Sequence, residues 1–331
     1  MRRREFLKAA AATTAAAALD SVAGPLRAQQ PSDIASPGTT SSNPPRLPRR
    51  AYKPGIDLSI IGFGGIVVMN AEPDHAARVV AQAVEKGVNY FDVAPSYGDA
   101  EVKLGPALRP YRKNVFLACK TAQRSREAAE AELKRSLEHL HTDYFDLYQL
   151  HAITDVKKDV DAAFASGGVM ELLIQARKDG RIRHIGFSAH SIEATLAALD
   201  RFDFDSVLIP VNFATFYKGN FGPQMIAAAE KRGAARLALK ALARQKWPQN
   251  DPLRPRYPKA WYQPLTDRHE AELALRFTLS QPVTAAIPPG EEELFWLAVE
   301  LAMNHRPITE SETRELMALA ESLDPIFRAT A

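Results

Sequence analysis

The sequence predicts an α/β protein, a single-domain (β/α)8 TIM barrel with a short segment before its first strand and an extra helix at its C-terminal end. Strand and helix patterns alternate eight times over roughly 250 residues, the usual size of such a barrel. The strand patterns are short, continuous apolar runs, as expected for parallel strands that are buried on both faces. The 331-residue chain is 46% hydrophobic and 24% charged, a composition typical of globular proteins. Periodicity alone leaves an open, doubly wound sheet as the alternative.

The first four strand–helix units follow from apolar runs and from apolar residues at helical spacing. The first strand ends in Gly64 and Gly65, and the helix after it stops at Gly87, because glycine commonly terminates a helix. The four units are 59–65 with 74–86, 89–93 with 101–108, 115–120 with 125–141, and 144–151 with 169–178.

The last four units repeat this pattern. They are 184–188 with 192–199, 206–212 with 224–231, 236–241 with 267–279, and 283–287 with 291–302. Residues 310–323 predict the trailing helix, and the segment 52–57 precedes the first strand.

The N-terminal residues 1–28 resemble a bacterial twin-arginine export signal. Arg3 and Arg4 stand before Phe6-Leu7 and an alanine-rich tract that is too short and too weakly apolar to span a membrane. We therefore expect recognition by the twin-arginine translocase, an exported, periplasmic location and no stable membrane span. The alternative is a fortuitous basic N-terminus. Residues 29–50, rich in Pro, Ser, Thr and Gly, predict a flexible leader, with the barrel at 51–331.

The chain has a net charge of +3, and its excess of positive charge comes from this front part. Residues 1–28 hold five basic and two acidic side chains, and residues 29–50 hold three basic and one acidic. The barrel itself therefore carries a charge of about −2. We expect no nucleic-acid partner, because the basic charge is not part of the folded domain.

Four polar side chains follow consecutive predicted strands. Asp92 ends the second strand, Tyr97 lies in the loop after it, Lys120 ends the third strand and His151 ends the fourth. Each has an ordinary structural explanation when taken singly. The carboxyl ends of barrel strands form the active-site face, so the four should lie together. Their combination favours a catalytic site.

At these residues the sequence resembles the aldo-keto reductase superfamily. Four segments are similar to its signatures: 62–65, 87–101, 118–121 and 142–151. The resemblance covers about residues 52–323 and implies reduction of an aldehyde or ketone to an alcohol with NAD(P)H. The expected partner is therefore a small-molecule carbonyl substrate.

The resemblance also implies a role for each of the four side chains. Tyr97 would be the general acid that protonates the carbonyl oxygen while a nicotinamide delivers hydride to the carbon. Lys120 would lower the pKa of the phenol, which is near ~10 in free tyrosine. Asp92 would hold Lys120 through a charge-assisted hydrogen bond. His151 would orient the carbonyl or assist proton transfer.

A cofactor-binding set follows from the same resemblance. Ser188 matches a Gly-x-Ser segment, His190 lies beside it, and Asn212 stands where the family places an amide side chain on the carboxamide. Lys240 lies in a segment similar to one that wraps the pyrophosphate. The complete expected set is Gly64, Ser188, His190, Asn212, Lys240, Pro289 and Gly290.

The region after the eighth strand departs from the family pattern. That pattern is Ile-Pro-Lys-Ser with an Arg five positions after the Ser, and its Lys and Arg hold the 2′-phosphate of NADP. Here Pro289 and Gly290 replace Lys-Ser, and Phe295 replaces the Arg. The glutamates at 291–293 either stabilise the helix start or favour NAD, so the cofactor is NADP(H) or NAD(H).

Three further residues are relevant to the comparison with the family. Arg244 and Lys246 follow the seventh strand and could supply phosphate binding from another side. His141 stands where the family often has a glycine that stops a helix.

Other classes of function remain open from the sequence. A cofactor-binding regulatory or interaction protein on the same barrel, similar to the β subunits of voltage-gated potassium channels, would account for the altered eighth strand. A metal-dependent barrel hydrolase would need a His-x-His pair on the first strand, which is lacking, so we expect no metal site. The loops 152–168, 215–223 and 245–264 should set the substrate.

Overall fold

The structure is a computed structural model that describes residues 46–329, all within one compact unit, Pro44–Ala331. The expected export signal and residues 29–45 of the expected leader lie outside the described residues. The folded part begins earlier than the expected position 51. Leu47 is buried and its N–H donates to the carbonyl of Lys86 at 2.9 Å, so the end of the expected leader belongs to the barrel.

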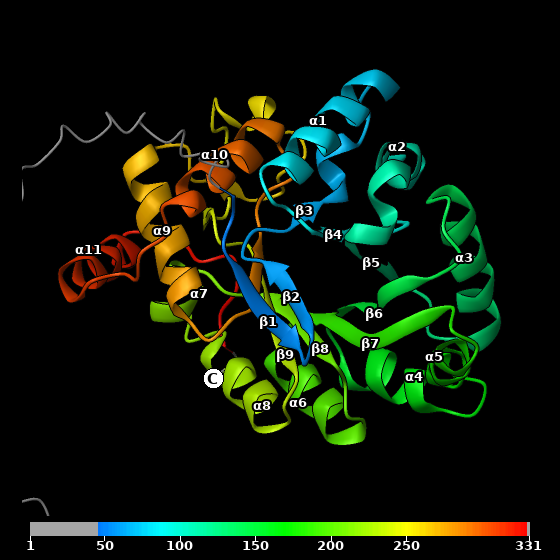
Figure 1. Ribbon diagram of the computed structural model, residues 1–331. Helices are drawn as coiled ribbons and strands as arrows, with labels where there is room; N and C mark the ends of the chain where they lie inside the picture. Colours follow the sequence, from blue (N-terminus) through cyan, green and yellow to red (C-terminus); the bar gives the residue numbers. More distant parts are fainter. Residues whose placement is uncertain (1–45, 330–331) are drawn as a thin grey trace, which may run out of the picture. The chain divides into compact units, whose positions relative to one another are not determined.

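Eight parallel strands form the barrel (Figure 1). They are β3 Phe63–Gly64, β4 Tyr90–Asp92, β5 Phe116–Thr121, β6 Phe145–Ile153, β7 Ile182–Ala189, β8 Ser206–Pro210, β9 Ala235–Leu239 and β12 Ala285–Ile287. A parallel bridge between Ile61 and Ala286 closes the ring, and the N–H of Gly62 donates to the carbonyl of Ala286 at 2.9 Å. This bridge confirms the barrel and rules out an open sheet.

A β-hairpin covers the amino-terminal end of the barrel strands (Figure 1). It is formed by β1 Arg49–Lys53 and β2 Ile56–Ser59, a segment that the sequence only placed before the barrel. Tyr52 and Leu58 join the buried cluster inside the barrel, and the Tyr52 hydroxyl donates to Ser206 Oγ at 3.1 Å. Because this end is covered, ligands must reach the interior from the carboxyl end.

Helices surround the barrel. They are α1 Pro73–Glu85, α2 Ala100–Leu108, α3 Arg126–His139, α5 Val169–Lys178, α6 Ile192–Arg201, α8 Pro223–Lys231, α9 Arg268–Ser280 and α10 Glu292–Met303. Their bounds differ from the expected ones by at most two residues. The trailing helix α11 Glu310–Glu321 begins with a capping box between Thr309 and Glu312 and packs against α9 and the short helix α7 Phe213–Tyr217.

Short elements in the loops were not predicted. They are α4 Ala162–Phe164, α7 Phe213–Tyr217, β10 Ala243–Gln245 and β11 Gln263–Pro264, with single turns η1 Gly65–Val68, η2 Arg109–Asn114, η3 Val156–Asp161 and η4 Arg254–Arg256. Between residues 46 and 329, no helix has the length and apolar character needed to cross a bilayer.

Candidate active site

A buried hydrogen-bond network joins the ends of β4, β5 and β6 inside the barrel. The Lys120 ammonium donates to Asp92 Oδ1 and to the carbonyl of Val93, the latter at 3.2 Å. Gln149 Nε2 donates to Asp92 Oδ2 at 3.0 Å. Lys120 and Asp92 are only 1% and 2% exposed, so this ion pair is held in a medium of low dielectric constant. Asp92 therefore fixes the position of the ammonium.

Strand alternation explains why Lys120 points inward. Its neighbour Cys119 joins the apolar layer between barrel and helices, whereas Ala118 joins the cluster inside the barrel. Gln149 and His151 are likewise two residues apart on β6. The alternation along β6 therefore also indicates Gln149, which is not one of the expected site residues.

Tyr97 lies above this network on the loop after β4. A tight turn, in which the Tyr97 N–H donates to the Ala94 carbonyl at 3.0 Å, folds the loop back over the strand ends. Gly98 continues the turn with φ 57°, in the left-handed region that favours glycine. The Lys120 Nζ lies 5.2 Å from the centroid of the Tyr97 ring. The structure therefore brings phenol and ammonium together as expected.

His151 completes the group at the end of β6. Its ring meets the Tyr97 ring edge to face, with centroids 5.8 Å apart, and its Nδ1 lies 3.4 Å from Ser96 Oγ. Burial and the nearby Lys120 lower the pKa of His151 to about 3. The imidazole is therefore neutral near pH 7 and can donate one hydrogen bond.

The pKa of the Tyr97 phenol is raised, whereas the sequence predicts that Lys120 lowers it. Burial raises the pKa of Tyr97 above its ordinary value, and the Lys120 ammonium opposes this without reversing it. Burial alone would lower the pKa of Lys120, but Asp92 and Tyr97 raise it overall. Lys120 therefore stays charged, and Tyr97 stays protonated near neutral pH, the form that a general acid needs.

A cavity of about 150 Å³ opens at the carboxyl end of the barrel strands next to these side chains. Asp92 and Tyr97 line it together with four residues of the expected cofactor set: Gly64, Lys240, Pro289 and Gly290. Ligand pockets usually measure roughly 300–1,000 Å³. The cavity is thus smaller than a dinucleotide requires.

A segment between β10 and β11 covers this cavity. Trp261 and Tyr262 line its outer side, and Lys259 Nζ reaches across to donate to the Val67 carbonyl at 2.8 Å. The Lys259 N–H donates to Glu291 Oε1 at 2.7 Å, which ties the segment to the start of α10. The segment therefore forms the outer wall of the cavity.

The other three residues of the expected cofactor set have structural contacts. Ser188 Oγ accepts from the Ala152 N–H at 2.7 Å and so holds the loop after His151. Asn212 Oδ1 accepts from the Thr215 N–H at 3.0 Å and caps α7, and Nδ2 donates to the Lys240 and Ala243 carbonyls. Asn212 thus holds the loop of Lys240, a role that the sequence did not predict.

His190 differs from these two residues because its ring keeps a free nitrogen. The ring stacks on Phe327, with centroids 5.3 Å apart. Its Nε2 is buried without a hydrogen-bond partner among residues 46–329. Burial and the nearby Lys240 lower the pKa of His190 to about 4.

The glutamates at the start of α10 hold neighbouring elements. Glu292 Oε2 lies 2.6 Å from His75 Nε2, and Glu293 pairs with Arg256 at 3.0 Å. These contacts favour the structural explanation of the three glutamates.

The two basic residues after the seventh strand do not line the cavity. Arg244 pairs with Glu270 at 3.1 Å, and Lys246 pairs with Asp324 at 3.2 Å. Both charges are therefore already compensated, and the expectation that they bind a phosphate gains no support.

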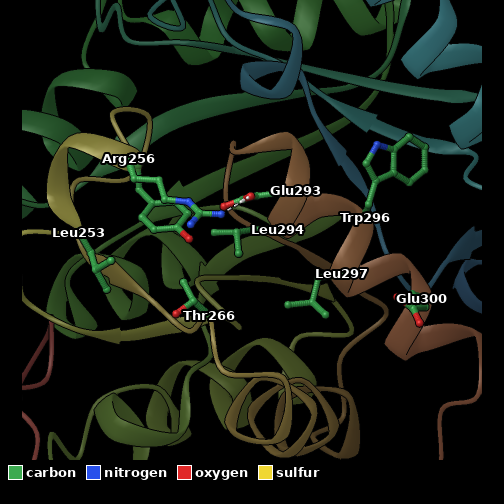
Figure 2. A pocket seen from close by; sticks show the side chains of 9 residues that line it. Leu253, Arg256, Thr266, Glu293, Leu294, Trp296, Leu297 and Glu300 are labelled. Atoms are coloured by element: carbon green, nitrogen blue, oxygen red, sulfur yellow. Dashed lines mark hydrogen bonds and ion pairs between the residues drawn. The ribbon is translucent and has the colours of Figure 1, made fainter.

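A second, wider pocket of about 650 Å³ lies between α10 and the segment 253–266 (Figure 2). Figure 2 shows Arg256 reaching Glu293, with Leu294 and Leu297 pointing between the loop and the helix. This second pocket shares no lining residue with the cavity at Tyr97. The smaller cavity, which Tyr97 and Asp92 line, is therefore the candidate active site.

The residues around the smaller cavity fit a nicotinamide cofactor. Gly64 and Gly290 line the cavity with backbone atoms. Lys259 supplies positive charge at the rim, as a diphosphate requires.

Residues 61–321 match the aldo/keto reductase family. The chain is 25% identical to an uncharacterized oxidoreductase, YqkF, of Bacillus subtilis over 292 residues, 80% of this chain and 93% of that protein. It is 34% identical to the aldo-keto reductase YhdN of the same organism over 161 residues, 42% of this chain and 46% of that protein. The holo form of aldo-keto reductase AKR11C1 from Bacillus halodurans superposes with a TM-score of 0.66 at 22% identity, covering 84% of this chain and 98% of that one.

The barrel and its site thus define an oxidoreductase of the nicotinamide-dependent, carbonyl-reducing class. The chain belongs to the aldo/keto reductase family.

Proposed function

We propose that this protein reduces an aldehyde or ketone to an alcohol, with Tyr97 as the general acid. The observation that carries the proposal is the contact between Tyr97 and the Lys120–Asp92 pair at the edge of the cavity. When bound, the nicotinamide cofactor supplies the hydride, two electrons that form the new C–H bond.

The side chains of the chain itself handle the proton. The Tyr97 O–H donates its proton to the carbonyl oxygen as the C–H bond forms, and the resulting phenolate takes a proton from solvent. The Lys120 ammonium, held by Asp92, stabilises this phenolate. His151 is neutral, so it donates a hydrogen bond that orients the carbonyl and leaves the proton transfer to Tyr97.

The cofactor is held by the backbone at Gly64, Pro289 and Gly290 and by the Lys259 ammonium. None of the residues at positions 289, 290 and 295, where the family pattern has Lys, Ser and Arg, carries a positive charge. This arrangement favours NADH over NADPH, because only NADPH brings a 2′-phosphate that needs a cation.

Titration with NADH and with NADPH, followed by steady-state turnover of a panel of aldehydes and ketones, tests the proposal. Trp261 is 55% exposed on the covering segment, so cofactor binding should change its fluorescence. Trp261→Phe removes this signal, and Trp296→Phe is the matched control that keeps it. Binding and turnover support the enzyme. Binding with no turnover of any carbonyl compound would favour a regulatory or interaction protein instead.

We also propose that the chain is exported by the twin-arginine pathway to the periplasm. The support is the segment Arg3-Arg4-Glu5-Phe6-Leu7-Lys8 followed by the alanine-rich tract. Fractionation of cells that express the full chain should find it outside the cytoplasm. A variant with Arg3→Lys and Arg4→Lys should stay inside, and equal distribution of both proteins would contradict export.

A further inference from the structure

The cavity beside Tyr97 contains a cation without a counter-ion. Lys240 lines this cavity, and its Nζ forms no hydrogen bond or ion pair with the part of the chain that the structure describes. The ammonium instead lies 5.1 Å from the centroid of Trp261 and 5.0 Å from that of Tyr262. Cation–π contacts of this kind hold a charge in place while leaving its N–H donors free.

The backbone of Lys240 is held in a conformation that is costly for a residue with a side chain. Its φ is 67°, in the left-handed region. Two donors fix its carbonyl there, Asn212 Nδ2 at 3.2 Å and the Ala243 N–H at 2.9 Å. This conformation aims the side chain at the cavity, whereas an ordinary loop lysine would extend into solvent.

A second unused polar group lies near Lys240. His190 Nε2 is buried without a partner in residues 46–329, and the ring is held by Phe327. Lys240 and His190 are close enough that the ammonium lowers the pKa of the imidazole. Asp92, the carboxylate that lines the cavity, is already bound by Lys120 and Gln149. Of the two ammonium groups that line the cavity, Lys259 donates to the Val67 carbonyl, and Lys240 is left for an incoming group, with the His190 imidazole nearby.

We propose that Lys240 and His190 form an anion-binding subsite beside Tyr97, so that the carbonyl substrate carries a carboxylate. This inference rests on the proposed carbonyl reduction and names its substrate class, a small oxo acid. The carbonyl meets Tyr97 and His151, and the carboxylate binds Lys240 and His190.

The same cation could instead bind the diphosphate of the cofactor, since both ligands present anionic oxygens. Paired substrates distinguish the carboxylate of the substrate from the diphosphate of the cofactor as the anion that Lys240 binds. The probes are 2-oxobutanoate and 4-oxobutanoate, each compared with its methyl ester, which keeps the carbonyl and removes the charge. We expect the wild-type protein to have a KM for at least one acid that is tenfold or more below that of its ester.

Lys240→Met removes the charge and keeps the length of the side chain. It should raise the KM for the acid about tenfold or more, the range for a lost hydrogen bond to a charged group. The KM for the ester and the Kd for the cofactor should stay within twofold. Lys240→Arg, which retains the charge, should keep the preference for the acid. His190→Phe retains the stacking on Phe327 and should raise the KM for the acid alone, by a smaller factor.

Several outcomes would overturn the inference. One is equal KM values for acid and ester in the wild-type protein. Another is an equal effect of Lys240→Met on acid and ester together with a weaker cofactor Kd, which would assign Lys240 to the diphosphate. If no carbonyl compound is reduced, the proposed function fails, but fluorescence titration with propanoate still tests the subsite. Propanoate binding that is lost in Lys240→Met supports it, and binding that is unchanged contradicts it.

Discussion

Gly290 and Ile66 pack so closely at the mouth of the cavity that a side chain at Gly290 would overlap Ile66. A β-carbon built there would clash with Cγ2 of Ile66 and lie 3.1 Å from its Cβ. The family pattern has Ser at this position, so the glycine follows from the bulk of Ile66 after β3.

Gly290→Ala should therefore destabilise the protein by about 1–2 kcal/mol, the usual cost of overpacking. Ile66→Ala should relieve the clash, so the double variant should lose less stability than the sum of the single variants. Thermal unfolding of the four proteins measures this coupling. Strictly additive losses would show that the two residues do not compete for space.

Gln149 positions Asp92, although it is not one of the expected site residues. Gln149→Leu removes its hydrogen bond to a buried carboxylate and should lower kcat about tenfold, which corresponds to about 1.4 kcal/mol. The Kd of the cofactor should not change. Gln175→Leu is the matched control, because it removes an exposed amide–carboxylate bond, to Asp179. An unchanged kcat in Gln149→Leu would show that Lys120 does not need this support.

His141 stops helix α3 in the left-handed conformation, with φ 51°. This is the position where the family often has glycine, and the histidine side chain is exposed. His141→Gly should stabilise the protein by about 1 kcal/mol, because glycine adopts this conformation without steric cost. Chemical unfolding checks the gain, with kcat as the control that should not move. A loss of stability would indicate that the His141 side chain contributes contacts of its own.

Binding of oxo acids should weaken as the pH rises. Burial and the neighbouring Lys120 lower the pKa of Lys240 to about 8, so its ammonium is charged below this pH and neutral above it. The groups around it are Lys120, His151, His190 and the rings of Trp261 and Tyr262. The KM for an acid should therefore increase above about pH 8, while that for its ester stays level. The Lys240→Arg variant should move the increase to higher pH, and a parallel rise for acid and ester would contradict this assignment.

The sequence predicts the barrel well because each strand is a continuous apolar run and each helix has one apolar face. The same regularity places Asp92, Lys120 and His151 at strand ends. The hairpin β1–β2 escaped prediction because its burial depends on Tyr52 entering a barrel that forms only in three dimensions. Local patterns carry no information on such a contact.

Contacts between distant segments also explain why the candidate site differs from the site that the sequence predicts. Arg244 looked free to bind a phosphate, yet Glu270 on α9 neutralises it. Asn212 matched an expected cofactor contact, yet the Lys240 and Ala243 carbonyls occupy its amide. Burial of Tyr97 outweighs the effect of Lys120 on its pKa, and neither burial nor its extent can be read from a motif.

In the proposed reaction, Tyr97 gives its proton to the carbonyl oxygen. The most direct test compares single-turnover hydride transfer in the wild-type protein and in Tyr97→Phe, each saturated with reduced cofactor. General acid catalysis typically contributes 10²–10⁴-fold, so the rate should fall by about 10³ while the cofactor Kd stays within twofold. A rate in Tyr97→Phe equal to that of the wild-type protein would show that Tyr97 is not the proton donor.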